Sequence, residues 1–178
     1  MKWVTRDHVH MDRVVSPWLI KRFIDPDAEF VFVPFGNEHP LPADAVAYAI
    51  PGAEIGPHDK SGSTFRKLIN KFKVSHPALE MMARIIESGI VHVFHQKDPG
   101  YSVANLEYPQ GMGLDAIAIG MMYATNNDAE NLDKSFPIYD ALFDYCRVQM
   151  LLEEKKEIAD LPPPQYWHTI KHELSRRP

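Results

Sequence analysis

Short apolar runs near the N-terminus predict strands on either side of one helix. Residues 2–5 and 29–33 are rich in β-branched and aromatic types, which favour extended backbone. Between them, Ser16-Pro17 is typical of a helix start, and apolar residues then recur at helical spacing until Asp25-Pro26 ends the segment. We therefore expect a strand–helix–strand crossover unit, with a third strand at 46–50.

From residue 64 onward the apolar positions recur at steps of three and four, which predicts helices. The longest helix is expected to start near Pro137 and to end before the prolines at 162–164. The fold class is therefore α+β, a small N-terminal sheet packed on a mainly helical C-terminal bundle. We expect one domain over 1–160 and a partly ordered, Pro-rich C-terminal tail over 161–178.

Composition narrows the function classes. The chain has 178 residues, of which 45% are hydrophobic, and its net charge of −5 argues against a nucleic-acid partner. A single cysteine, Cys146, excludes a disulfide framework or a Cys-rich metal site, and its apolar surroundings indicate a buried, inert thiol. No stretch is long and apolar enough for a membrane span or a signal peptide, so a cytoplasmic location is expected. The sequence contains no Gly-rich phosphate-binding loop, so we do not expect a nucleotide cofactor.

The first polar cluster is His8-Val-His10-Met-Asp12-Arg13. If this segment is extended, His8, His10 and Asp12 share one face and could ligate a divalent transition metal such as Zn, Fe, Ni or Mn. The helix start that follows would favour an anion beside Arg13. The alternative is a polar turn in which Asp12 and Arg13 form salt bridges.

A second cluster lies in the loop 51–59, where two glycines and two prolines fix the backbone around Glu54 and His58. These two side chains could be metal ligands, or a general base and its partner. The alternative is a structured turn with exposed polar tips.

The third cluster, 91–98, contains His92, His95 and Asp98. In a helix these residues form one row that can place three ligands together, whereas in a strand the two histidines point to opposite faces. The alternative is a histidine that is simply part of the core. Because its neighbours are apolar, we expect His92 to be partly buried and to meet Glu54 in a polar pocket.

The sequence resembles the chromate-resistance protein family, the C-terminal domain of ChrB-type proteins. The resemblance rests mainly on the motifs Trp3-Val-Thr-Arg6, His10-Met-Asp12-Arg13, Ser16 to Pro26, Ile50 to Glu54 and Tyr139-Asp-Ala-Leu142, and it covers most of residues 1–150. It implies a role in the response to chromate. Longer members carry an N-terminal regulatory domain, so a DNA-binding role is not expected to carry over to this chain.

This chain departs from the family pattern at two places. Ser63 stands where the family usually has a cysteine, and Val93 and His95 stand where acidic residues are usual. The resemblance therefore does not bring a thiol-based reduction of chromate to this chain, although a metal site with altered ligands remains compatible with it.

Two main hypotheses follow, and both use these residues. In the first, the protein binds a metal or a small oxyanion; the metal ligands are Glu54, His58, His92 and His95, with His10, Asp12 and Asp98 as additional ligands, and the anion contacts are Arg6, Arg13 and Arg22. In the second, it is a metal-dependent hydrolase or oxidoreductase with a substrate other than chromate, and Asp12 or Asp98 is the base. A protein-interaction module is a third option, and a homo-oligomer is compatible with all three.

Overall fold

The computed structural model describes residues 1–36 and 40–176, and it confirms the α+β class. Its three strands, all parallel, form a sheet in the order β2-β1-β3. They are β1 (Lys2–Arg6), β2 (Glu29–Val33) and β3 (Ala45–Ala47). The crossover unit is confirmed, because β1 and β2 pair in parallel with a helix between them. The central strand buries Trp3 and Val4 completely.

The first helix, α1 (Asp12–Leu19), begins four residues before the Ser16-Pro17 start expected from the sequence. Pro17 therefore lies inside the helix, where it lacks the N–H that would normally bond the carbonyl of Arg13. A π-helical turn, η1 (Ile20–Ile24), continues the segment, and the Asp25 N–H donates to the Ile20 carbonyl at 2.7 Å. The end at Asp25, directly before Pro26, agrees with the expectation.

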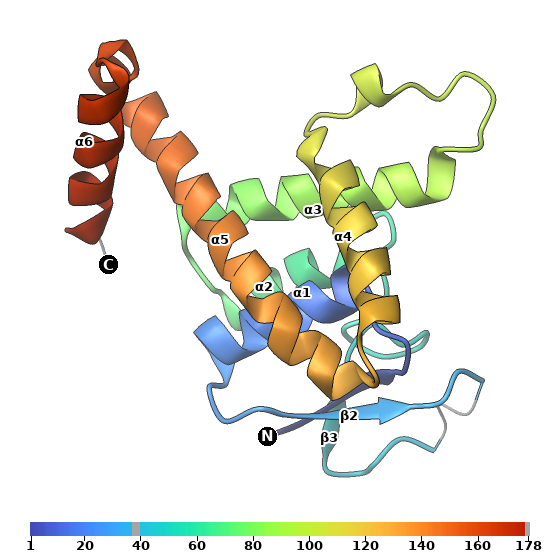
Figure 1. Ribbon diagram of the computed structural model, residues 1–178. Coiled ribbons are helices and arrows are strands. Elements are labelled where there is room, and N and C mark those ends of the chain that lie inside the picture. The colour runs from blue at the N-terminus through green and yellow to red at the C-terminus, as the bar shows by residue number, and fades with distance from the viewer. Residues whose placement is uncertain (37–39, 177–178) are drawn as a thin grey trace.

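The remaining helices form a bundle above the sheet (Figure 1). They are α2 (Thr64–Phe72), α3 (Pro77–His95), α4 (Gln110–Ala124), α5 (Asp128–Glu154) and α6 (Pro163–Ser175), with short 3-10 turns η2 (Val103–Asn105) and η3 (Lys156–Asp160). Helix α3 runs across the molecule behind α4 and α5 and packs on both. Gly89 and Gly111 allow the close crossing of α3 and α4: a Cβ on Gly89 would lie 2.7 Å from the Gly111 carbonyl oxygen.

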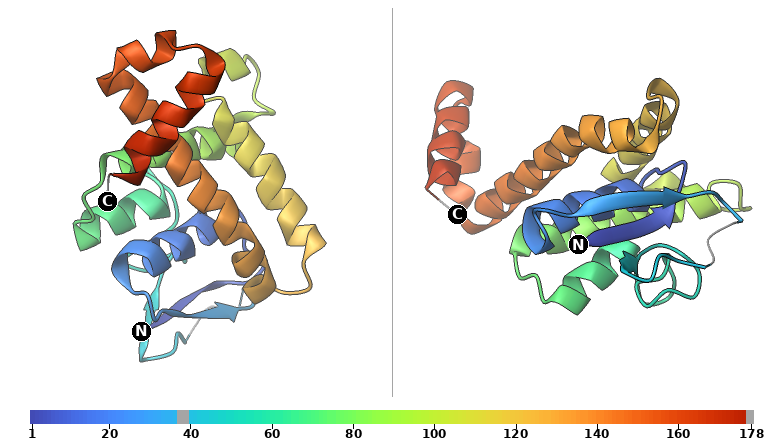
Figure 2. Two further views of the ribbon diagram at one scale, coloured as in Figure 1. Left: turned by 60° about the vertical axis from the view of Figure 1, so that its left-hand side comes forward. Right: turned by 90° about the horizontal axis from the view of Figure 1, so that it is seen from below.

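The C-terminal part differs from the expectation in two features. Helix α5 begins nine residues before Pro137, because Asn127 caps it by accepting from the Glu130 N–H at 2.9 Å. The expected partly ordered tail is largely helix α6, which packs against the end of α5 (Figure 2). Leu151, Ile158 and Ile170 form a small second core there, separate from the main one.

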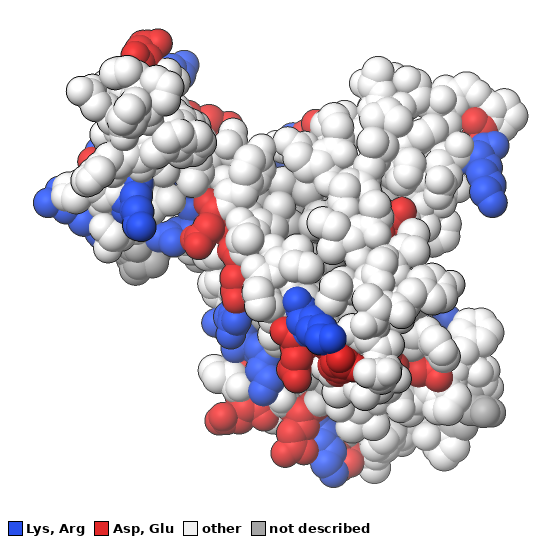
Figure 3. Space-filling model, viewed as in Figure 1, with Lys and Arg blue, Asp and Glu red and all other residues white. Residues whose placement is uncertain are grey.

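Helix α4 presents an apolar outer face. Ile117, Ile119 and Tyr123 are all exposed, and the only charged residue of the helix, Asp115, is buried. Figure 3 accordingly shows a broad uncharged surface over α4. Within residues 1–36 and 40–176, no helix combines the length and apolar character needed to span a membrane.

Candidate functional site

Residues from all three polar clusters of the sequence meet at a pocket of about 230 Å³. We call it the basic pocket. Its polar wall comes from the end of β1, the start of α1, the loop before α2 and the start of α2, and α3 closes it with apolar side chains. The residues that matter for its chemistry are Arg6, His10, Asp12, Arg13, His58 and Phe94.

The segment between β1 and α1 is an irregular turn, so the extended form, in which His8, His10 and Asp12 would share one face, is not observed. His8 and Met11 have φ angles of 54° and 44°, which breaks the alternation of side chains along a strand. The start of α5 holds this turn, because the Asp128 carboxylate accepts from the N–H groups of His8 and Val9 at 3.0 and 2.8 Å. His8 is left on the surface beside Asp7, and His10 faces the basic pocket.

Arg13 donates to groups that carry no formal negative charge. Its guanidinium contacts the carbonyl oxygens of Asp7 and His8 at 3.2 and 3.3 Å and Nδ1 of His10 at 3.5 Å. Burial, together with the positive charge of Arg6, lowers the pKa of Arg13 from its usual 12.5. The Arg6 guanidinium lies over the Phe35 ring, 4.9 Å from its centroid. The two guanidinium groups therefore bring positive charge to the pocket, beside the carboxylate of Asp12.

The same contact defines the state of His10. Burial and the positive charge of Arg13 lower the pKa of His10, so its ring is neutral near pH 7. A backbone hydrogen bond with His8 also acts on this ring and opposes the lowering of its pKa. Arginine can only donate hydrogen bonds, so the 3.5 Å contact from Arg13 to Nδ1 favours the tautomer with the ring proton on Nε2. His10 therefore offers an N–H donor from its other nitrogen.

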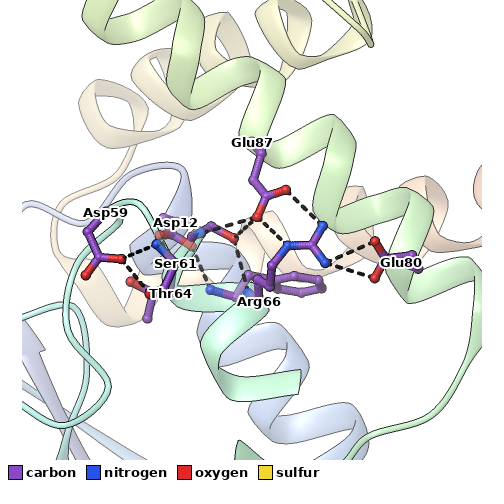
Figure 4. Close-up of polar contacts among 9 residues, drawn as sticks. Asp12, Asp59, Ser61, Thr64, Arg66, Glu80 and Glu87 are labelled. Atoms are coloured by element: carbon purple, nitrogen blue, oxygen red, sulfur yellow. Dashed lines mark hydrogen bonds and ion pairs between the residues drawn. The ribbon is translucent and has the colours of Figure 1, made fainter. Parts of the chain in front are cut away.

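Asp12 joins the basic pocket to the N-terminus of α2. Its carboxylate accepts from the backbone N–H of Thr64 at 2.7 Å and of Phe65 at 3.0 Å (Figure 4). Burial raises the pKa of Asp12, although these hydrogen bonds act in the opposite direction. Asp12 is a helix-capping group supplied by another helix, and it also lines the pocket.

His58 brings the second cluster to the same place. Its ring stacks on Phe94 of α3, with 4.6 Å between the centroids and 23° between the planes. The loop behind it is held by Thr64, whose hydroxyl donates to the Gly56 carbonyl at 3.0 Å. The ring pair separates the basic pocket from a second, larger pocket on its other side.

We call this larger pocket, of about 520 Å³, the charged groove. Ion pairs between α2 and α3 hold the charges of Arg66, Glu80 and Glu87 in this groove. Arg66 donates to Glu87 from Nε at 2.6 Å and to Glu80 from Nη1 at 2.9 Å (Figure 4). At the rim, Arg84 pairs with Glu107. Burial by itself would raise the pKa of Glu87, but the hydrogen bonds from Arg66 outweigh it and hold that pKa below its usual value.

The four expected metal ligands are not brought together at one site, although His58 and His95 both line the charged groove. Glu54 is exposed and pairs with Lys71, so the expected pocket location of Glu54 is wrong. His92 accepts from or donates to the Tyr101 hydroxyl at 2.8 Å, and His95 pairs with Asp98 at 2.7 Å on the surface. Within the described parts of the chain, no three His, Cys, Asp or Glu side chains are grouped so that they could hold a metal ion. The metal site stays a prediction.

The helical form of the third cluster, left open by the sequence, is now clear, because α3 extends through His95. Of the three expected anion contacts, Arg6 and Arg13 line the basic pocket. Arg22 lies elsewhere: it forms a bidentate pair with Asp140, which also accepts from the Trp18 indole at 2.8 Å. Cys146 is fully buried, and burial raises the pKa of its thiol to about 12.

Sequence reasoning missed two acidic groups near these pockets. Glu87 of α3 was not predicted as part of a site, because its pairing with Arg66 depends on the packing of two helices. Asp115 lies in an apolar helix and is buried, and among the described residues no donor reaches its Oδ1 atom. Its negative charge acts on His10 and opposes the lowering of that pKa. The only sequence feature that could have indicated a role for Asp115 is that it is the single charged residue in the apolar run 111–124.

Comparison with known protein families shows which family this chain matches. The model of the ChrB C-terminal domain matches residues 3–146, which include both pockets and end within α5. The chain therefore belongs to the ChrB C-terminal domain family. This confirms the resemblance to the chromate-resistance family that the sequence motifs indicated.

A curated relative, Protein ChrB of Cupriavidus metallidurans, is 28% identical over 142 residues. The match covers 80% of this chain and 40% of the length of that protein, so the chain spans less than half of its relative. No solved structure matches the chain. The family domain thus contains the main core and both pockets, whereas α6 lies beyond the matched residues.

Proposed function

We propose that this protein binds a small tetrahedral oxyanion in the basic pocket, and that chromate is the relevant ion in its family. The observation that carries the proposal is the state of Arg13: its guanidinium is largely enclosed, lines the pocket and donates to two carbonyl oxygens and an imidazole. A guanidinium in such surroundings keeps its charge and attracts an anion more strongly than one in water.

The other groups support the same ligand. His10 supplies an N–H donor, Arg6 adds a second guanidinium, and His58 lines the same pocket, stacked on the Phe94 ring. A volume of about 230 Å³ accommodates an ion of this size with several waters. Planar guanidinium groups and ring N–H groups are the donors that suit tetrahedral oxyanions.

Isothermal titration calorimetry with phosphate, sulfate and chromate tests the proposal. We expect the Arg13→Gln variant to lose most of its affinity, at least about tenfold, because charge-assisted hydrogen bonds of this kind contribute about 1.5–3 kcal/mol. Arg84→Gln is the matched control: this arginine is half-exposed, lines the charged groove and pairs with Glu107. It should bind as the unaltered protein does. Equal losses in both variants, or no binding by the unaltered protein, would overturn the proposal.

A further inference from the structure

The basic pocket contains one feature that an anion site does not need. Asp12 lines it with a carboxylate, and a second carboxylate, Asp115, acts electrostatically on the neighbouring His10. A negative group in the wall repels a fully deprotonated dianion, and this cost is large in partly enclosed surroundings. The carboxylate would instead be a favourable partner for a ligand that carries a proton.

Asp12 has the capacity to accept that proton in a hydrogen bond. A carboxylate has about four lone-pair sites. Its Oδ2 accepts from the Thr64 N–H at 2.7 Å, and its Oδ1 accepts from the Phe65 N–H at 3.0 Å and, more weakly, from the Ser16 hydroxyl at 3.5 Å. The Thr64 hydroxyl also acts on Asp12, but it donates its proton to the Gly56 carbonyl. The three donors that remain all belong to α1 or α2, so of about four lone-pair sites one acceptor position is left for a group in the pocket.

We propose that the basic pocket selects oxyanions that carry a proton and discriminates against sulfate; this inference rests on the proposed function. In the bound state the ligand O–H donates to Asp12, and the ligand's other oxygens accept from Arg13, His10 and Arg6. Hydrogen phosphate, hydrogen arsenate and hydrogen chromate belong to this class. Sulfate and selenate, which stay fully deprotonated except in strong acid, do not.

The discrimination has a clear physical use. Chromate and sulfate have the same shape and charge, so guanidinium groups alone distinguish them poorly. Chromate takes up a proton near neutral pH and sulfate does not. A carboxylate in the wall therefore separates the two ions, because a site that needs a ligand hydroxyl rejects an analogue without one.

The decisive experiment compares two ions of equal charge and similar size. Near pH 7.5 most phosphate is the singly protonated dianion, and sulfate is a dianion without a proton. We expect phosphate and arsenate to bind at least about tenfold more tightly than sulfate and selenate in calorimetric titrations. Equal affinities for phosphate and sulfate would overturn this inference and leave oxyanion binding intact. No binding of any of the four ions would overturn both.

The Asp12→Asn variant tests the role of the carboxylate. The N-cap residue of α2, Ser63, is unchanged in this variant, but the Asn amide can accept from only one of the Thr64 and Phe65 N–H groups, so circular dichroism and thermal unfolding are needed to verify that it folds. The amide no longer repels sulfate, so the preference for phosphate should fall towards unity. A preference that persists in a folded variant would contradict the assignment to Asp12. If the variant does not fold, the comparison of the four ions in the unaltered protein still decides the inference.

A pH series extends the test to chromate. Several titratable and charged groups face the site or act on its residues. They are Arg6 from β1, Asp7, His10, Asp12 and Arg13 from the following turn and α1, Tyr48 after β3, His58 from the loop before α2, Asp115 from α4, and Asp128 and Tyr139 from α5. Protonation of groups on the protein changes the affinity for every anion, and selenate measures that effect alone. From pH 8 to pH 6, the affinity for total chromate should rise several-fold more than the affinity for selenate. Parallel curves would overturn the inference.

Discussion

The basic pocket and the charged groove share a wall formed by His58, Ile90 and Phe94, but their arginines have different kinds of partner. In the groove, Arg66 is matched by Glu80 and Glu87, and Arg84 is matched by Glu107. In the pocket, Arg13 contacts carbonyl oxygens and an imidazole, which leave its formal charge in place. Arginine content alone would rank the two cavities as equals.

The difference follows from where each arginine stands. Arg66 lies on α2 and faces α3, so two helices that pack together bring opposite charges into register. Arg13 follows a turn in which positive φ angles direct the carbonyl groups of Asp7 and His8 towards its guanidinium. We infer that the larger cavity is mainly a structural ion-pair network, and that the smaller one has the charge needed to hold a ligand.

The strongest way to break this comparison is the Arg66→Met variant. It would leave Glu87, whose side chain is only 28% exposed, with the Ser63 N–H and hydroxyl as its remaining donors. Because breaking a buried pair leaves an uncompensated charge, we expect the free energy of unfolding to fall by about 3 kcal/mol. Urea denaturation measures this change, and calorimetry should show little change in oxyanion affinity.

The double variant Arg66→Met with Glu87→Leu is the control. Removing both charges should restore much of the lost stability, because the penalty comes from the charge that is left behind. If the single variant were as stable as the unaltered protein, or if it lost oxyanion binding while folded, the assignment of a structural role to the groove and a binding role to the pocket would be incorrect.

The second variant tests the packing of α3, the helix that carries Ile90 and Phe94 of the shared wall, against α4. Gly111→Ala would place a Cβ against the backbone of α3, 2.6 Å from the Ile85 carbonyl oxygen and still closer to the Gly89 nitrogen. Backbone atoms cannot rotate away, so α3 and α4 must separate, and we expect a loss of about 2 kcal/mol. Gly113→Ala, on the same helix with nothing within 4 Å of the new Cβ, should be neutral or stabilising. Similar thermal unfolding of the two variants would refute the close crossing.

Several strands and helices of the fold could be predicted from the sequence because they depend on local residue patterns. The strands at 2–5 and 29–33 were predicted within one residue, since runs of β-branched and aromatic residues determine them locally. Helix α2 was expected from residue 64, where it begins. The start of α1 was not, because Asp12 bonds to α2 across 52 residues of sequence and no local rule reports such a contact.

The candidate site was predictable only in part, for the same reason. Arg6, His10, Arg13 and His58 were chosen from motifs, and the fold does bring them together. Glu54 and Arg22 were chosen by the same rules, but Lys71 and Asp140 pair with them elsewhere. Residue type indicates what a side chain can bind, whereas tertiary packing determines which partner lies next to it.

The pH dependence of stability gives a sharper test of the groove. The pKa of Glu87 is held below its usual 4.5, so the pairing stabilises the fold fully above that value and is lost as pH falls through the lowered pKa. Glu87→Gln should therefore be destabilised by about 1 kcal/mol near pH 7, and the difference from the unaltered protein should shrink below pH 4.5. Urea denaturation at pH 7, 5 and 3.5 measures it. A difference that is constant with pH would show that the charge of Glu87 is irrelevant.

The smallest expected effect concerns the wall itself. The Phe94 side chain is 60% exposed, so Phe94→Ala should lower the free energy of unfolding by less than about 1 kcal/mol. The ring nevertheless holds His58 at the pocket through their stacking at 4.6 Å, so its removal should lower phosphate affinity two- to fivefold, or by about 0.4–1 kcal/mol. Val91→Ala is the matched control, because Val91 is also exposed on α3 but lines the groove and not the basic pocket. Calorimetry should show an unchanged affinity for it. If the two variants bound phosphate alike, the ring pair would belong to the surface of α3 and not to the binding site.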